Sequence, residues 1–284
     1  MAEPVKQSEI FDRKRRRLVR DRSYRRTGGH NFLMQIMSDE ILDRLNLVKR
    51  NFSKALLIGQ ISDGFRLQLS ERKIATVTAE SGSMHVQDRG GIQCDEDRIP
   101  FADHSFDLVI NINTLDTVND LPGALALTRR ILKPDGFFLA SVIGAGSLSS
   151  LKAVLIEAEG DKIAPHIHPQ IDVRTLGDLM TRAGLTLPVT DVDKLRLRYP
   201  SLKRLVDDLR DIGGTNILAD ATDSISKAAY NKAKKLFRDN ADAEGKTEEI
   251  LEIIYLCGWA PHPDQPKPTR RGSAQTSLKS ALKS

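Results

Sequence analysis

Polar residues and a glycine stand directly after strand-like runs at four points of this sequence. Gly59 follows the run ALLI, and Glu80 follows KIATVTA. Asp95 follows GIQC, and Asn111 closes FDLVIN. Because ligands of parallel sheets bind outside the carboxyl ends of the strands, these residues predict one binding crevice. A carboxylate at the position of Glu80 can accept hydrogen bonds from two ribose hydroxyls, although a surface glutamate that ends a strand fits equally well.

Other residue patterns that could do chemistry are incomplete. Neither of the phosphate-binding patterns G-x-x-x-x-G-K-[ST] and G-x-G-x-x-G occurs. His166 and His168 could be two metal ligands, but two ligands without a third make no site, so no metal site is predicted. Asp95 and Glu96 could act as general acid and base, but a solvated loop or a contact to an adenine ring explains this pair better.

Strand-like and helix-like stretches alternate along most of the chain. This rhythm predicts an α/β fold with a mostly parallel sheet and helices on both faces. The sequence also predicts a helix over 39–48 with Ser38 as its N-cap, a turn at Lys133–Gly136, and a helix capped by Asp172. The predicted strands lie at 55–58, 73–79, 91–94, 106–111, 137–143, 189–197 and 250–257.

The chain is expected to have three parts. Residues 1–50 form a basic helical segment, and residues 51–260 form the α/β domain. A helical stretch at about 200–245, before the last strand, is predicted to be an insertion over the crevice. Residues 261–284 are rich in Pro, Lys, Arg and Ser, which predicts a flexible tail.

The positive charge is concentrated near the start of the chain. Between Asp12 and Arg26 nine basic residues stand against two acidic ones, an excess of +7, whereas the whole chain carries +5. Nucleic acid is a disfavoured partner, because stacking aromatics are scarce in this segment and basic runs are commonly solvated helix faces. An acidic protein partner explains the same charge.

Neither membrane insertion nor export is expected. No run reaches the roughly 18 apolar residues of a membrane-spanning helix, and the first residues lack the apolar region of a secretory signal. Glu3, Glu9 and Asp12 argue against an acid-poor mitochondrial transit peptide. Cys94 and Cys257 lack a metal-type or redox-type partner, which fits a reducing compartment, so a cytoplasmic location is expected.

Several short blocks, taken in their order and spacing, resemble class I S-adenosylmethionine-dependent methyltransferases. The central blocks are IPF at 99–101, SFDLV at 105–109, VNDLP at 118–122 and LKPDG at 132–136. More narrowly, the chain resembles the branch of the mitochondrial complex I assembly factor described as a protein arginine hydroxylase, with malonyl-carrier-protein methyltransferase as a more distant likeness. The likeness extends through IFDR at 10–13, RAGL at 182–185, DLR at 208–210, IYLCGWAPH at 254–262 and GSA at 272–274.

The resemblance implies a Rossmann-like methyltransferase that binds S-adenosylmethionine. Glu80 would hold the ribose, while Asp95 and Glu96 would approach the adenine. It further implies methyl transfer to, or arginine hydroxylation of, a side chain of an NADH dehydrogenase (complex I) subunit, reached through the basic segment and the insertion. The implied cofactor-binding residues are Gly59, Gly64, Glu80, Asp95, Glu96 and Asn111.

Two departures from the family pattern support an alternative hypothesis. Ile61 stands where the family has the middle glycine of a Gly-x-Gly-x-Gly turn, and a side chain there obstructs the approach of backbone to ligand. Residues 115–120 read LDTVND where the family has LHWVND. The alternative is a catalytically inactive, methyltransferase-like assembly scaffold; a small-molecule methyltransferase is a third hypothesis. No catalytic residue is assigned, since Asp116 faces the predicted pocket by position alone.

Overall fold

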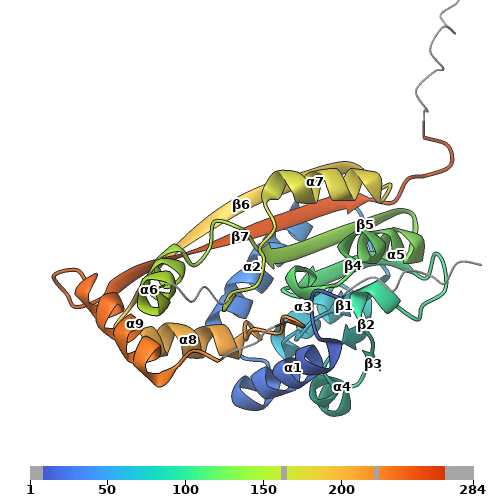
Figure 1. Cartoon of the computed structure of the whole chain (residues 1–284). Helices are drawn as coiled ribbons and strands as arrows, with labels where there is room; N and C mark the ends of the chain where they lie inside the picture. Colours follow the sequence, from blue (N-terminus) through green and yellow to red (C-terminus); the bar gives the residue numbers. More distant parts are fainter. Residues whose placement is uncertain (1–8, 161–164, 221–223, 266–284) are drawn as a thin grey trace, which may run out of the picture.

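The computed structural model describes residues 9–160, 165–220 and 224–265 of the 284-residue chain. One seven-stranded sheet runs through them in the order β3-β2-β1-β4-β5-β7-β6 (Figure 1). Its strand pairs are parallel, except for the two antiparallel pairs that β7 forms with β5 and β6. The strands are β1 Lys54–Ile58, β2 Ala75–Glu80, β3 Ile92–Gln93, β4 Phe106–Ile112, β5 Leu132–Ile143, β6 Thr186–Tyr199 and β7 Thr247–Trp259.

The centre of the sheet explains why its strands read as continuous apolar runs. Every residue of β4 is buried, as expected of a parallel strand that is covered on both faces. β1 pairs with β2 on one side and with β4 on the other, so the strand order reverses there. Open α/β sheets bind ligands outside the carboxyl ends of the strands at such a reversal. The predicted fold class is confirmed.

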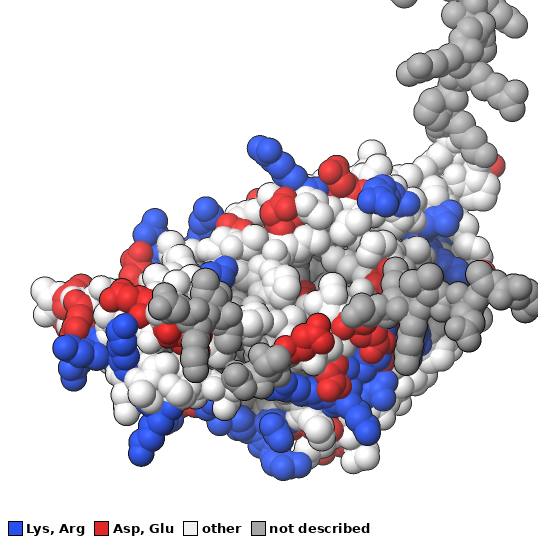
Figure 2. Space-filling model, viewed as in Figure 1, with Lys and Arg blue, Asp and Glu red and all other residues white. Residues whose placement is uncertain are grey.

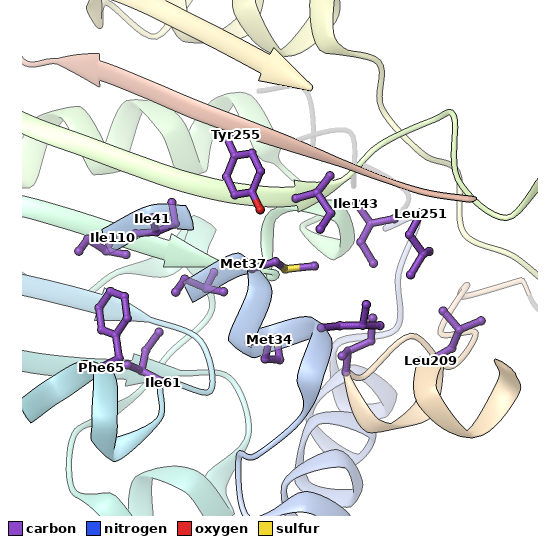
Figure 3. Packing of buried hydrophobic residues seen from close by; sticks show 14 of the residues in the cluster. Met34, Met37, Ile41, Ile61, Phe65, Ile110, Ile143, Leu209, Leu251 and Tyr255 are labelled. Carbon is purple, nitrogen blue, oxygen red and sulfur yellow. The ribbon is translucent and has the colours of Figure 1, made fainter. Parts of the chain in front are cut away.

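Helices cover both faces of the sheet. One core cluster joins one face to α2, α3, α6, α8 and α9, and a second joins the other face to α5 and α7. In Figure 3, Met37 and Ile41 of α2 lie close to Ile110 of β4 and Tyr255 of β7. The helices are α1 Arg13–Thr27, α2 Phe32–Leu47, α3 Asp63–Glu71, α4 Ser83–Arg89, α5 Leu121–Ile131, α6 Ser149–Glu159, α7 Val173–Arg182, α8 Leu202–Asp211 and α9 Lys227–Asp239, with 3₁₀ turns η1 Glu96–Arg98 and η2 Leu115–Thr117.

The structure corrects two local predictions. Ser38 is buried in the middle of α2 and does not cap it; the cap is Asn31, because the apolar spacing of this helix already begins at Leu33. The predicted turn at Lys133–Gly136 lies within β5, where the pairing with β4 shifts register. Asp135 adopts a φ of +54° there, and its N–H donates to the carbonyl of Ala260, just after β7, so the chain bulges without leaving the sheet.

The stretch between β6 and β7 forms the predicted helices. α8 contacts α1, and α9 packs on α6. Of the helices in the described ranges, none is long and apolar enough to cross a membrane. The first eight residues, the GSA block at 272–274 and most of the predicted tail lie outside the described residues.

Candidate cofactor crevice

The carboxyl ends of β1 to β4 bring most of the predicted site residues to one edge of the sheet. Gly59 follows β1, and Asn111 lies near the end of the adjacent β4. Glu80 ends β2, while Asp95 and Glu96 follow the neighbouring β3. All four polar side chains are buried. The strand ends therefore bring these residues together as predicted, and this edge of the sheet is called the crevice below. What contacts its carboxylates decides its chemistry.

The carboxylate of Glu80 is bound by Arg20 of α1, a partner that sequence reasoning missed. Arg20 Nε donates to Glu80 Oε1 at 3.0 Å, and Nη2 donates to Oε2 at 2.6 Å. This bidentate contact, called a fork below, is the strongest geometry between a guanidinium and a carboxylate. The remaining Nη1 donates to the carbonyl of Asn113 at 3.1 Å. Arg20 and Glu80 are only 5% and 1% exposed, so the pair lies inside the protein.

Glu80 also accepts hydrogen bonds from the chain that follows it. The N–H groups of Ser81 and Gly82 donate to Oε1 at 2.8 and 3.2 Å, and the Ser81 hydroxyl donates at 3.1 Å. Burial alone would raise the pKa of Glu80, but the charge and hydrogen bonds of Arg20 outweigh burial and lower this pKa to about 2. Glu80 is therefore ionised at neutral pH, and both of its oxygens are engaged.

A second arginine of α1 fills the place that the resemblance gives to adenine. Arg16 Nη1 and Nη2 donate to the two oxygens of Glu96 at 2.8 and 3.0 Å. Its other donors reach the carbonyl of Thr114 at 3.0 Å and the hydroxyl of Thr117 at 3.1 Å. Arg16 is 4% exposed, so this second fork is buried as well.

Two further arginines extend the pattern towards solvent. Arg13 donates to both oxygens of Asp97 at 2.7 Å, and Arg17 donates to Asp95 at 2.7 Å. The four arginines stand at positions i, i+3, i+4 and i+7, the pattern that places side chains on one side of a helix. This spacing, opposite four acidic residues at the ends of β2 and β3, was the signal in the sequence that could have predicted the contact.

Further hydrogen bonds hold α1 and the residues before it in place. Phe11 and Asn119 exchange two hydrogen bonds, at 2.8 and 2.9 Å. Gln60 donates to the carbonyl of Arg20 at 2.8 Å, and Asp21 accepts from the N–H of Met84 in α4 at 2.8 Å. A small apolar cluster also supports α1. Its buried members are Phe11, Val19, Ile217 and Leu218.

The side chain of Ile61, in the turn after β1, packs into the hydrophobic core and does not face a ligand site. Ile61, expected beside a ligand, is 2% exposed and lies with Phe65 in the hydrophobic core (Figure 3). Gly59 adopts a φ of +114°, and a Cβ there would lie 2.5 Å from the carbonyl oxygen of Ile112. Gly64 lies in the first turn of α3 with no atom within 4 Å of an added Cβ. Gly59 is thus required by the close approach of β1 and β4, and Gly64 is not required by any contact.

We expect the two glycines to respond oppositely to alanine. Gly59→Ala should lower the free energy of unfolding by about 1–3 kcal/mol or more, because it combines an unfavourable φ with a backbone clash. Gly64→Ala should be neutral or stabilising by up to about 1 kcal/mol, because alanine favours the helix. Urea unfolding of both variants measures the difference. Equal effects would contradict the described turn.

Asp116 lies between two hollows. One, of about 20 Å³, borders Arg16 and Arg20, and the other, of about 240 Å³, is lined mainly by apolar side chains of α6, α8 and the segment 166–170. Burial raises the pKa of Asp116 and lowers the pKa of His168. Both shifts favour the uncharged form of the side chain.

The two predicted metal-ligand candidates, His166 and His168, instead contact other residues of the fold. His168 Nε2 accepts from the N–H of Ile217 at 2.9 Å, and His166 Nε2 lies 2.7 Å from Glu159 Oε1. Among the described residues, no three His, Cys, Asp or Glu side chains are grouped to hold a metal ion.

Comparison with known proteins assigns the family. Residues 51–140 match the methyltransferase domain family. The chain is 30% identical over 285 residues to a protein of Danio rerio named arginine-hydroxylase NDUFAF5, mitochondrial, and the match covers 95% of this chain and 88% of that protein. The chain belongs to the NDUFAF5 arginine-hydroxylase family.

Two more comparisons extend the likeness beyond this family. A malonyl-[acyl-carrier protein] O-methyltransferase of Coxiella burnetii is 27% identical over 77% of this chain and 78% of its own length. The solved structure of the YcgJ protein of Bacillus subtilis superposes with a TM-score of 0.54 at 15% identity, covering 78% of this chain and 98% of that one. The predicted resemblance to class I methyltransferases, in the arginine-hydroxylase branch, is confirmed.

The expected cytoplasmic location is wrong. The arginine-hydroxylase relatives from Danio rerio and Homo sapiens, which cover 95% of this chain, are both named mitochondrial proteins. Of the acidic residues that supported this expectation, the two that the structure describes serve the fold: Asp12 is the N-cap of α1, and Glu9 pairs with Arg13.

S-adenosylmethionine does not fit the crevice while α1 lies in it. Pockets for small molecules usually enclose about 300 Å³ or more. The hollow beside Arg16 and Arg20 has about 20 Å³. A ribose and an adenine would also need the oxygens of Glu80 and Glu96, which the two guanidinium groups already engage.

Proposed function

We propose that this protein serves the assembly of respiratory complex I by acting on a side chain, such as an arginine, of an NADH dehydrogenase subunit. The family relation carries the proposal, since a named arginine-hydroxylase aligns with 95% of this chain. The methyltransferase domain matched at residues 51–140 supports the crevice at the ends of β1 to β4 as the reaction site.

A second candidate is a scaffold that binds the same subunit without turnover. The buried pairs Arg20–Glu80 and Arg16–Glu96 favour it, because they engage the groups that would hold the cofactor. Both candidates need a surface for a protein partner.

A basic groove between α1 and α8 supports an acidic protein partner. Arg22, Arg25 and Arg26 of α1 and Arg210 of α8 line a hollow of about 350 Å³. Arg26 pairs with Asp211 at 2.5 Å, whereas Arg22 and Arg25 form no ion pair with any residue that the structure describes. Figure 2 shows Lys and Arg side chains gathered along the lower margin, where α1 lies.

The test of this function is deletion of the gene followed by analysis of complex I. Loss of assembled NADH dehydrogenase, restored by the wild-type gene, is the expected result. Mass spectrometry of the subunits then separates the candidates: an arginine carrying one added oxygen or methyl group only when the protein is present indicates an enzyme. Restored assembly without such a mark indicates a scaffold. Normal complex I without the gene would rule out both.

Charge reversal in the groove should weaken this function. Arg22→Glu with Arg25→Glu is expected to reduce the recovered complex I several-fold without unfolding the protein, because both side chains lie outside the buried pairs. The matched control is Arg174→Glu with Arg182→Glu on the exposed side of α7, across the sheet. Equal recovery with the two double variants would show that the groove does not bind the partner.

A further inference from the structure

We infer that α1 is a built-in occupant of the cofactor crevice, so that S-adenosylmethionine binds only when Arg16 and Arg20 leave it. The inference concerns the access of a ligand to the crevice and does not depend on which protein the chain serves. It rests on the two buried forks, on the balance of charge in the crevice, and on the attachment of α1 to the insertion.

The charge of the crevice favours arginine over a nucleoside. Glu80 and Glu96 are both buried, and each faces one guanidinium with two hydrogen bonds. A ribose diol or an adenine amine offers hydrogen bonds but no positive charge at these positions. A buried carboxylate that loses its cation is left uncompensated, which costs far more than the loss of a surface ion pair. The nucleoside part of the ligand is therefore a poorer partner than Arg20 and Arg16.

The arginines that fill the crevice are all carried by one helix. They lie on one side of α1 together with Arg13 and Arg17, so all four ion pairs share one rigid support. The backbone of Arg20 is itself held by Gln60. Opening the crevice thus means displacing α1 as a unit.

The insertion between β6 and β7 helps to hold α1 in place. Ala219 N–H donates to the carbonyl of Ile10 at 2.9 Å, and Asp12 N–H donates to that of Ile217 at 2.8 Å. Ser23 of α1 donates to the carbonyl of Asp211 at 2.7 Å. α1 is therefore held between the edge of the sheet and the insertion. A movement of the insertion would change the access of a ligand to the crevice.

Calorimetric titration with S-adenosylhomocysteine and S-adenosylmethionine tests the inference on the full chain. We expect the wild type to bind neither at millimolar ligand. Arg16→Ala with Arg20→Ala removes both cations and their volume, and should bind at least about ten-fold tighter than the wild type. The matched control is Lys14→Ala with Arg15→Ala, two exposed basic residues of α1 outside the buried forks, which should behave like the wild type.

Circular dichroism must show that the variant is folded. If it is not, Arg20→Lys replaces it, since lysine keeps the charge but cannot bridge both oxygens of Glu80, and it should bind the ligand more tightly than the wild type. Micromolar binding by the wild type would overturn the inference. So would a folded variant that binds no better than the wild type, because α1 would then not be what excludes the ligand.

Discussion

Arg20→Met is expected to lower the free energy of unfolding by about 3–5 kcal/mol, among the largest effects of any single substitution in this chain. The reason is the carboxylate left behind: Glu80 is 1% exposed, and without Arg20 its charge is buried with only backbone and hydroxyl donors. In a chain of this size the melting temperature should fall by roughly 10 °C. Urea unfolding and calorimetry measure both quantities.

Removing both partners should restore most of the lost stability. In Arg20→Met with Glu80→Gln no buried charge remains uncompensated, so this double variant should be clearly more stable than Arg20→Met alone. The coupling between the two substitutions isolates their interaction. The surface pair Arg196–Glu248, with side chains 70% and 49% exposed, is the matched control and should couple by less than about 1 kcal/mol. Additive effects at Arg20 and Glu80 would mean that α1 does not occupy the crevice in solution.

Acid should remove the stabilisation that Glu80 provides. Its pKa is lowered from 4.5 to about 2 in the folded protein, so the contribution is fully present above pH 4.5 and is lost as the pH falls through about 2. The shift corresponds to roughly 3 kcal/mol. Urea unfolding measured from pH 6 to pH 2 should therefore show a steeper loss of stability in the wild type than in the double variant Arg20→Met with Glu80→Gln. Parallel pH profiles for the two proteins would contradict the pairing.

The strands and the crevice were predictable because short-range features of the sequence define them. Buried parallel strands read as apolar runs, and their carboxyl ends meet by topology, which placed Glu80, Asp95 and Asn111 together. The bulge at Lys133–Gly136 was not predictable in the same way. Pro and Gly predict a turn in isolation, whereas the hydrogen bond from Asp135 to Ala260 joins residues far apart in the chain.

The occupant of the crevice depends on tertiary contacts that composition does not show. The basic run around Arg16 and Arg20 suggested a solvated face or a partner surface, because arginine is rarely buried without a partner. The partners lie at least 60 residues away in the chain, at Glu80 and Glu96. Only the match between the helical spacing of the arginines and the acidic residues that end β2 and β3 could have predicted the pairs.

Ile61 has its side chain in the hydrophobic core, a place that the family pattern alone does not indicate. Its position in the glycine turn predicted obstruction of the ligand. In the structure the N–H of Ile61 donates to the carbonyl of Gly59 at 3.0 Å, and the side chain packs in the core with Phe65. The crevice is filled from α1 instead, by groups about 40 residues earlier in the chain.

Hydrogen exchange of the α1 amides tests the central claim most directly. In the wild-type protein we expect the amides of residues 16–24 to be strongly protected, and this protection should not change when S-adenosylhomocysteine is added at millimolar concentration. In Arg16→Ala with Arg20→Ala the same amides should exchange much faster, while those of β4 stay protected. Rapid exchange of α1 in the wild type, or protection that appears only with the ligand, would show that α1 lies outside the crevice and would contradict the account.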